Sequence, residues 1–411
     1  MKSYAMLAGI TLLLLARSTY ADDPATAPAG KYKGFSVSIY CPQGTLNLNN
    51  LERQWAAISS QLKVDKVYIE TFRSRRYLAE ADIEPIKNFF TSRGVKIAGG
   101  MTLCYNDSGQ FETFSFTNPE HRAMVKSVTE MTARHFDEII LDDFFFYTTK
   151  TDADIAAKGD RSWTQFRLDM MRDASKNLVV GPAKGVNPKV KMIIKFPNWY
   201  EHFQGLGYDL EQEPKIFDGI YTGTETRDPA LTEQHLQPYE SYNIIRYFEN
   251  IKPGGNGGGW VDTFQYNTVD RYAEQLWDTV FAKAPEMMLF NWSAMSQPFT
   301  VGQRPWASQK TSFNVDDMIA GAGGTQPTTA RVAGYVLEQA DKVVPKLGKP
   351  IGLKSYRPYQ ATGEDILHNF LGMAGIPIDL HPTYPEGDNS HTILLTEAAK
   401  DDRDILKKMK S

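Results

Sequence analysis

The sequence is poor in cysteine: Cys41 and Cys104 are the two in 411 residues. Two cysteines cannot form the disulfide framework that stabilises many small secreted domains. Both fall at the ends of predicted strands, so one bridge and two separate buried thiols are both compatible with the sequence. Neither has the spacing of a zinc site. A hydrophobic core must therefore stabilise the fold, and 42% apolar residues in a chain of this length suffice for a large domain plus a smaller one.

The sequence also lacks a strong charge of one sign. A formal net charge of -4 gives no broad basic field, so we expect no nucleic-acid partner, whereas a neutral ligand such as a sugar is compatible. The glycine-rich run at 254–259 lacks the Gly-Lys-Ser/Thr ending of a phosphate loop and precedes a predicted strand. We interpret it as a flexible connection on the floor of the fold. No cofactor is expected.

Beyond the first residues, no stretch approaches the roughly 18 apolar residues of a membrane span. At the start of the chain, Lys2 precedes an apolar core at 5–16 and small residues at 19 and 21 (TYA at 19–21), which predicts a signal peptide over 1–21. An uncleaved anchor is the alternative. Residues 22–33 are rich in Ala, Pro and Asp and are typical of a flexible leader. We therefore expect an exported protein, periplasmic or extracellular, without a stable membrane span after cleavage.

From residue 34 onward, apolar β-type runs alternate with segments of helical periodicity. The predicted strands are 35–41, 64–72, 95–105, 137–141, 190–196, 218–222, 260–266 and 286–292. The predicted helices are 51–62, 83–93, 119–136, 163–177, 240–250 and 268–284. Eight strands in this rhythm predict an α/β fold, a (β/α)8 TIM barrel over 34–325. An open doubly wound sheet is the alternative, but residues 42–45 (PQGT) are not its glycine fingerprint.

Residues 326–411 predict a small βαβ unit. Its strands are expected at 350–356, 376–380 and 392–396, with helices at 363–374 and 397–410. A parallel sheet this small cannot cover both of its faces. It must therefore pack on the barrel, contact a partner or belong to a longer chain.

Six of the eight predicted barrel strands end in polar side chains, at the ends where barrel enzymes hold their working residues. Buried charges are costly unless they are paired, so packing alone does not explain this pattern. The candidate binding residues are Glu70, Arg73, Lys195, Arg227, Asp262 and Asn291, together with the aromatic residues Tyr147, Trp199 and Trp292 as stacking faces for a sugar ring. Lys195 can contact a sugar hydroxyl, hold an aspartate ionised, or simply pair with Asp142.

Asp143 and Glu225 are the predicted catalytic pair. Glycoside hydrolysis needs one protonated and one ionised carboxyl group, and the ends of the fourth and sixth strands face each other across part of the barrel mouth. The adjacent Asp142 and Asp143 point to opposite sides if the strand continues. We prefer Asp143 as the reacting group, because it is the last residue before the aromatic run, and keep Asp142 as the alternative.

The run LDDFFFY (141–147), followed by SWTQFRLDMM (162–171), resembles bacterial glycosyl-hydrolase-like barrels that carry an Asp-Asp-Tyr-Phe-Tyr-Pro stretch at strand four. Thr148 stands where that pattern has Pro. A carboxylate pair on strands four and six is also similar to the α-galactosidase and α-glucosidase type of barrel. The segment LHNFLGMAGIPIDL (367–380) resembles the amidotransferase-like domain of some β-galactosidases, which there serves assembly. That resemblance implies a homo-oligomer formed through the C-terminal unit.

Three functions are compatible with these observations. A secreted glycoside hydrolase acting on an oligosaccharide or polysaccharide is favoured, and a non-catalytic carbohydrate-binding barrel is the alternative. A metal-dependent hydrolase using Asp142, Asp143 and a histidine is weakest, because no His-x-His or His-Glu-x-x-His spacing occurs. The histidines considered, His121, His135, His202 and His235, also lie outside the predicted strand ends.

Overall fold

The computed structural model describes residues 31–108, 112–199, 203, 205–227, 236–264, 268–298, 311, 313–320, 326–363, 365–385 and 392–410. The predicted signal peptide and most of the predicted leader lie outside these ranges. Among the helices described, none has both the length and the apolar character that a membrane span requires.

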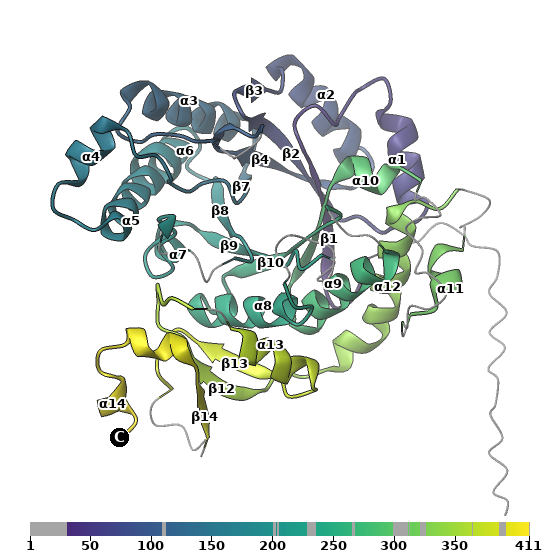
Figure 1. Ribbon diagram of the computed structural model, residues 1–411. Helices are drawn as coiled ribbons and strands as arrows, with labels where there is room; N and C mark the ends of the chain where they lie inside the picture. Colours follow the sequence, from purple (N-terminus) through teal and green to yellow (C-terminus); the bar gives the residue numbers. More distant parts are fainter. Residues whose placement is uncertain are drawn as a thin grey trace, which may run out of the picture.

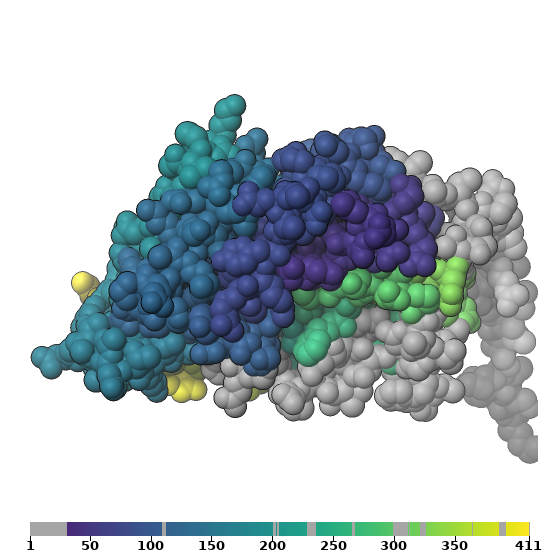
Figure 2. Space-filling view, turned by 90° about the horizontal axis from the view of Figure 1, so that it is seen from above, coloured from purple at the N-terminus to yellow at the C-terminus, as the bar shows by residue number. Residues whose placement is uncertain are grey.

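Eight parallel strands form a closed barrel surrounded by helices (Figure 1). β1 pairs with β11 on one side and with β2 on the other, so the sheet closes on itself. Figure 2 shows the purple segment that begins the barrel against the green segments that end it. The predicted (β/α)8 barrel is confirmed. The barrel strands are β1 Ser36–Cys41, β2 Lys66–Arg73, β4 Lys96–Thr102, β7 Glu138–Leu141, β8 Lys191–Phe196, β9 Gly219–Gly223, β10 Asn256–Asp262 and β11 Glu286–Phe290.

Helices connect consecutive strands, and several begin at side-chain caps. Asn118 accepts a hydrogen bond from the backbone N–H of Glu120 at the start of α3, and Ser162 accepts one from Gln165 at the start of α5. The helices of the barrel are α1 Leu51–Ser59, α2 Glu80–Thr91, α3 Pro119–His135, α4 Asp152–Lys158, α5 Trp163–Ala174, α6 Gly181–Val186, α7 Glu213–Ile216, α8 Glu240–Ile251, α9 Val269–Phe281, α10 Trp292–Ser296, α11 Val315–Ile319 and α12 Thr329–Val343. Short strands β3 Arg76–Tyr77, β5 Cys104–Asn106 and β6 Glu112–Thr113 extend from the barrel. α12 lies beyond the predicted domain boundary at residue 326 and packs against α9 and α10.

The interior of the barrel is filled by side chains. Each of the eight strands contributes one residue to a single buried cluster, which consists of Tyr40, Tyr68, Ala98, Ile140, Ile193, Tyr221, Trp260 and Met288. The alternate strand residues face outward and pack under the helices in a second, larger cluster. Because both faces are buried, the strands have the near-continuous apolar sequences typical of parallel sheets.

The seventh barrel strand begins earlier than expected. The glycine-rich run was interpreted as a flexible connection, but β10 starts at Asn256 and includes Gly257 and Gly258. A Cβ atom on Gly257 would lie 2.6 Å from the Tyr221 ring, and one on Gly258 would lie 2.5 Å from the carbonyl oxygen of Glu286. The interpretation was wrong at these positions, because glycine is needed where a tyrosine ring and a neighbouring strand press against the backbone.

The C-terminal unit packs on the outside of the barrel. Its parallel sheet has the order β13-β12-β14, and β13 lies against α8. Asn250 of α8 donates hydrogen bonds of 2.9 Å to both Asp379 Oδ1 and the carbonyl oxygen of Leu380. The elements of the unit are β12 Leu353–Tyr356, α13 Ile366–Met373, β13 Ile378–His381, β14 Ile393–Leu395 and α14 Ile405–Lys408.

The helix predicted over 397–410 is wrong as a continuous element. It is divided into a 3-10 turn, Glu397–Asp401, and α14. Asp402 lies at the break, where its carboxylate accepts hydrogen bonds from the Tyr356 hydroxyl, from the Lys408 ammonium and from the backbone N–H of Asp404. These local and tertiary bonds compete with the helical pattern.

A buried polar cluster holds the C-terminal unit together. Ser355 Oγ lies 2.6 Å from His368 Nε2, and His368 Nδ1 faces Asp365 Oδ1 at 3.0 Å. The residue types match a nucleophilic triad, but Ser355 and His368 have no exposed surface and Ser355 donates to the carbonyl oxygen of Leu394. The cluster therefore joins β12 to α13 and β14.

Candidate active site

Lys195 is the centre of the barrel mouth. It extends from β8, its side chain is 3% exposed, and Nζ lies 2.7 Å from Asp143 Oδ2 and 3.6 Å from Asp142 Oδ1. The same nitrogen donates to Glu225 Oε1 and lies 4.2 Å above the centre of the Trp260 ring. Burial lowers the pKa of Lys195, but the surrounding carboxylates raise it well above its usual value. Lys195 is therefore a permanent positive charge among three acids.

Asp142 is held by donors on several sides. Its side chain accepts hydrogen bonds from Arg73 Nη2 at 2.8 Å, from Thr102 Oγ1 at 3.2 Å and from the backbone N–H of Asp143 at 2.8 Å. Burial opposes ionisation, but the charges of Lys195 and Arg73 keep the pKa of Asp142 below its usual value. Asp142 is thus an ionised carboxylate whose orientation is fixed by the protein.

Asp143 is the more accessible of the two aspartates. Its side chain is 13% exposed, against 4% for Asp142, and Lys195 is the cation that contacts it. Its backbone carbonyl accepts a hydrogen bond from the Tyr208 hydroxyl. Burial raises the pKa of Asp143 to about 6, with Lys195 opposing and Asp142 reinforcing the rise.

Glu225 lies across Lys195 from Asp143, just beyond the end of β9. Oε1 accepts the hydrogen bond from Lys195, whereas Oε2 is buried without a hydrogen-bond partner among the described residues. Asn198 Nδ2 donates to the backbone carbonyl of Glu225 at 2.7 Å and fixes the chain at this point. Burial raises the pKa of Glu225 to about 7, with Lys195 lowering it and Asp143 raising it.

The Asp143 and Glu225 carboxyl groups share one hydrogen-bond donor. Two such bonds of about 3 Å place the two acceptor oxygens at most about 6 Å apart. β8 is the only strand between β7 and β9, which explains the closeness. The separation is small enough for two carboxyl groups that act on one sugar ring.

Glu70 and Arg73 form a support beneath Asp142. Glu70 is fully buried and accepts hydrogen bonds from the Tyr40 hydroxyl at 2.8 Å and the backbone N–H of Gln43 at 2.6 Å. Arg73 bridges Glu70 at 3.0 Å and Asp142 at 2.8 Å. Both residues lie at the mouth as predicted, but their polar groups are occupied by protein partners.

Arg227 and Asp262 form the opposite rim of the mouth. They pair at 2.9 Å, and the Arg227 guanidinium lies 5.1 Å from the ring centre of Phe264. Phe264 follows β10 and is 58% exposed. An aromatic ring this exposed beside a polar site is a suitable surface for the apolar face of a sugar.

Three predicted binding residues are placed elsewhere or used structurally. Tyr147 has no exposed surface and donates to Asp154, and Trp292 has none and stacks on Trp55. Both therefore belong to the core, which corrects their assignment as stacking faces. Asn291 caps α10 by accepting from the backbone N–H of Ala294 at 3.1 Å. Trp199 is partly exposed and packs edge-on against Phe146.

Sequence reasoning missed Tyr40, Asn198, Tyr208, Gly223 and Phe264 at or beside the mouth. Phe264 carried a signal, because it lies two residues after Asp262 at a predicted strand end. Asn198 carried a similar one at the end of the fifth strand. Tyr208 lies in an irregular segment, and no local pattern connects it to Asp143.

In the parts of the chain that the structure describes, no three His, Cys, Asp or Glu side chains are grouped to hold a metal ion. His121 accepts from the backbone N–H of Ser115 at 2.9 Å, and His135 lies 3.2 Å from Glu80. His202 and His235 lie outside the described residues.

Cys41 and Cys104 are buried free thiols, so the two do not form a bridge here.

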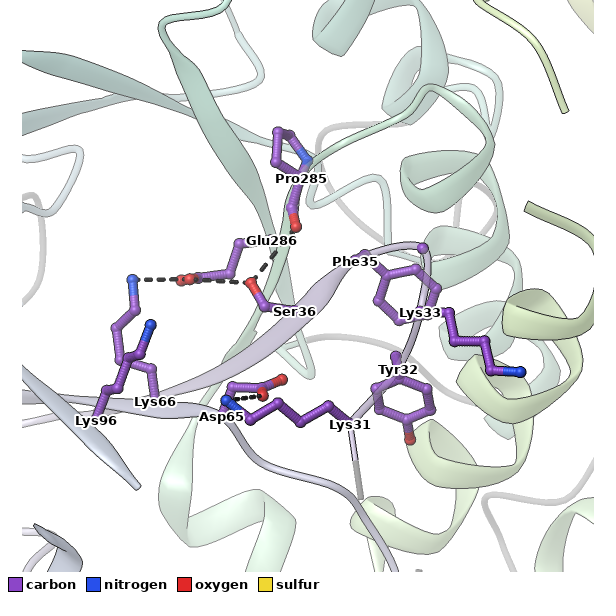
Figure 3. A pocket seen from close by; sticks show the side chains of 11 residues that line it. Lys31, Tyr32, Lys33, Phe35, Ser36, Asp65, Lys66, Lys96, Pro285 and Glu286 are labelled. Carbon is purple, nitrogen blue, oxygen red and sulfur yellow. Dashed lines mark hydrogen bonds and ion pairs between the residues drawn. The ribbon is translucent and has the colours of Figure 1, made fainter. Parts of the chain in front are cut away.

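A cavity of about 400 Å³ lies at the opposite end of the barrel, where the strands begin (Figure 3). Lys66 contacts Glu286 at 2.7 Å there, and Lys31 lies 3.5 Å from Asp65. None of the carboxylates of the mouth lines this cavity. Because barrel enzymes carry their chemistry at the carboxyl ends of the strands, the mouth and not this cavity is the candidate active site.

Comparison with known proteins agrees with this architecture. A GH5_18 protein from Streptomyces cattleya, solved in complex with Manb1-4GlcNAc, has a TM-score of 0.54 at 10% identity, covering 91% of this chain and 97% of that one. A GH5_18 protein from Bifidobacterium longum subsp. longum, in the same type of complex, has a TM-score of 0.53 at 10% identity, covering 91% and 94%. At this identity the likeness concerns the fold.

The sequence itself has a curated relative. "Uncharacterized protein SSO3021" from Saccharolobus solfataricus is 30% identical over 294 residues, which is 63% of this chain and 48% of the relative. The chain thus spans about half the length of that relative. Residues 348–411 match the family described as "Uncharacterized protein SSO3021, second domain". Residues 24–346 match the family described as "Probable glycosyl hydrolase, catalytic domain". The chain therefore belongs to this glycosyl hydrolase family, and its barrel lies within the residues that match the family's catalytic domain.

Proposed function

We propose that the barrel hydrolyses O-glycosidic bonds of an oligosaccharide or polysaccharide with Asp143 and Glu225 as its carboxyl pair. The observation that carries the proposal is the shared contact of both carboxyl groups with Lys195 at the mouth of the barrel. A buried ion pair with a purely structural role needs only one carboxylate for each cation. Here one cation serves two acids with raised pKa values, the arrangement required when one carboxyl group must stay protonated.

Glu225 is proposed as the proton donor. Its Oε1 is occupied by Lys195, and its Oε2 faces no hydrogen-bond donor among the described residues, so a proton is best accommodated on Oε2. Burial raises the pKa of Glu225 to about 7, which keeps a large protonated fraction near neutral pH. In the first step the Glu225 carboxyl group rotates so that Oε2, which is buried in the free protein, faces the mouth, and its proton passes to the glycosidic oxygen as the leaving group departs.

Asp143 is proposed as the nucleophile. It is more exposed than Asp142 and contacts a permanent cation, so it reaches substrate while ionised. Its oxygen bonds to the anomeric carbon as the glycosidic bond breaks. A water molecule then cleaves this glycosyl ester and gives its proton to Glu225. The Asp143 and Glu225 oxygens that contact Lys195 lie at most about 6 Å apart, which favours this retaining course over an inverting one, for which the carboxyl groups lie about 6.5 to 9.5 Å apart.

Asp142 is proposed to hold Lys195 and Arg73 in place, because its own oxygens are engaged by three protein donors. Phe264 and Trp199 are proposed as stacking surfaces for sugar rings, and Arg227 and Asp262 as a polar rim. The proposed substrate is a neutral sugar, since the cations Arg73, Lys195 and Arg227 each already contact a carboxylate.

The test is a screen of aryl glycosides and plant and microbial polysaccharides with product analysis. We expect turnover by the natural protein and a loss of at least about 1,000-fold for Asp143→Asn and for Glu225→Gln. Glu213→Gln is the matched control, because Glu213 is another fully buried carboxyl group that lies outside the mouth. Sugar binding without turnover would favour the non-catalytic carbohydrate-binding protein, and full activity of both variants would refute the proposed pair.

Export is a separate proposal that rests on the N-terminal sequence. We propose that residues 1–21 are removed during secretion to the periplasm or the medium, and that the C-terminal unit mediates self-association. N-terminal sequencing of the protein recovered from each cell fraction tests the first, and light scattering with and without residues 348–411 tests the second. An intact Met1 in the cytoplasmic fraction would contradict export.

A further inference from the structure

We propose that Gly223 is a positioning residue for Glu225, because its missing side chain leaves the space that the Glu225 carboxyl group occupies. Where the inference concerns catalysis, it rests on the proposed function of Glu225. Gly223 is the last residue of β9, two positions before Glu225. Neither the sequence patterns nor the family matches assign it a role.

The reason for glycine at this position is steric. The φ angle of Gly223 is not positive, so a left-handed backbone conformation is not the reason for glycine here. A Cβ atom built on it would lie 2.4 Å from Glu225 Oε2 and 3.2 Å from both Glu225 Cδ and the backbone nitrogen of Asn198. A separation of 2.4 Å is far inside van der Waals contact, so the carboxyl group and a side chain at 223 cannot occupy their places together.

The strand is less able to move than the carboxyl group. The backbone N–H of Thr224 donates to the carbonyl oxygen of Trp260 at 2.9 Å, and Asn198 Nδ2 holds the carbonyl oxygen of Glu225 at 2.7 Å. Oε2 is the far end of a flexible side chain and has no hydrogen-bond partner among the described residues. A methyl group at position 223 is therefore expected to displace the carboxyl group and leave the barrel intact.

Displacement of the Glu225 carboxyl group changes its distance from every charged group that faces it. Lys195 comes from β8, Asp143 follows β7, Asp262 ends β10 and Arg227 follows β9. A carboxyl group driven off the strand loses its hydrogen bond to Lys195 and gains exposure to the mouth. Burial is the largest cause that raises the pKa of Glu225 to about 7, so this pKa should fall toward the usual glutamate value of about 4.3.

The same strand offers a matched control. Gly219 begins β9, and a Cβ atom there would meet its nearest neighbours, Lys191 Cε and Ile193 Cγ1, at 3.5 and 3.6 Å. These are ordinary contacts. Gly219→Ala therefore adds the same methyl group to the same strand without displacing Glu225.

The experiment compares Gly223→Ala with Gly219→Ala and the natural protein in kcat, KM and the pH profile of kcat/KM. Gly223→Ala should lose about 100-fold in kcat with KM within a few-fold, because misplacement of a reacting group by about 1 Å has that effect. The basic limb of its profile should move to lower pH. Gly219→Ala should match the natural protein. Unchanged kcat and an unchanged basic limb in Gly223→Ala would overturn the proposal.

Two readouts do not depend on turnover. In protein labelled with ¹³C at the glutamate carboxyl carbon, the Glu225 signal, assigned by its loss in Glu225→Gln, should titrate at lower pH in Gly223→Ala. The change Gly223→Ala should also cost no stability in a Glu225→Ala background, where the clash is gone, even if the single variant is unfolded. An equal loss of stability in both backgrounds would place the clash at Asn198 and overturn the proposal. If the natural protein hydrolyses no glycoside, the proposed function fails while these readouts still decide the role of Gly223.

Discussion

Lys195 Nζ lies 2.7 Å from Asp143 Oδ2 and also donates a hydrogen bond to Oε1 of Glu225, the proposed proton donor. The lysine therefore lowers the pKa of both proposed reacting groups at once, against the rise that burial causes. Its 3% exposure means that water contributes little to the balance of charge.

Removal of the Lys195 charge should shift the activity profile to higher pH. Lys195 lowers the pKa of Asp143 and of Glu225, so both values rise in Lys195→Met and the ionised nucleophile appears only at higher pH. We expect the acid limb of kcat/KM to move by at least about one pH unit. Lys191→Met, on the same strand with a side chain 49% exposed, is the control and should keep the natural profile. A profile that stays in place in Lys195→Met would contradict this role.

The natural enzyme should have a narrow, bell-shaped dependence of kcat/KM on pH. The proposed mechanism requires Asp143 ionised, with a pKa of about 6, and Glu225 protonated, with a pKa of about 7. Because one lysine couples the two groups, the limbs belong to the pair. In the residual activity of Glu225→Gln the basic limb should disappear, and the acid limb should remain at a shifted pH. A rate that stays constant from pH 5 to pH 9 would be incompatible with this pair.

The stability of the protein should fall as pH rises above the usual range of a glutamate, because of Glu213. Burial raises the pKa of Glu213 to about 8 in the folded state, although Ser175 and the backbone N–H of Asp209 donate to its oxygens. The unfolded chain releases this proton near pH 4.3 and the folded chain near pH 8, so stability declines between those values, by up to about 1.4 kcal/mol per pH unit, and is level above them.

Glu213→Gln removes this titration. Urea denaturation at pH 5, 6, 7 and 8 should give a shallower decline for the variant than for the natural protein. Parallel declines would show that Glu213 is ionised in the folded chain.

Loss of Arg73 should destabilise the fold, whereas loss of its neighbour Arg76 should not. Arg73 is buried between Glu70 and Asp142, so Arg73→Met leaves the buried Glu70 without its cation and Asp142 with Lys195 alone, at a cost of about 3 kcal/mol. Arg76 is 55% exposed and pairs with Asp107, so Arg76→Met should cost less than about 1 kcal/mol. Equal midpoints of chemical denaturation for the two variants would contradict the buried support.

The sequence predicted the barrel well because each strand is a short apolar run followed by polar residues. This pattern of apolar runs followed by polar residues placed Asp143, Lys195 and Glu225 at the carboxyl ends of their strands. Because the strands are parallel, these ends lie together. The orientation of single aromatic residues did not follow. Trp292 follows the end of a barrel strand by two residues, but its indole contacts Gln54 and Trp55, and this depends on how α10 packs against α1.

Glycines were the other source of error. The composition of the run at 254–259 suggested flexibility, whereas the structure uses Gly257 and Gly258 to admit Tyr221. A glycine in a strand can mean space for a distant side chain, and only the three-dimensional arrangement tells which one. The same limitation hid the role of Gly223.

The layer of eight side chains that fills the barrel closes the path along the barrel axis. Tyr68 and Tyr221 extend that layer toward Glu138 and Glu286, which Lys66 joins at the far end. No sugar chain can thread through such a plug. In the proposed reaction, substrate arrival, water entry and product departure must all use the face that carries Asp143 and Glu225, so a slow-leaving product would block the next turnover.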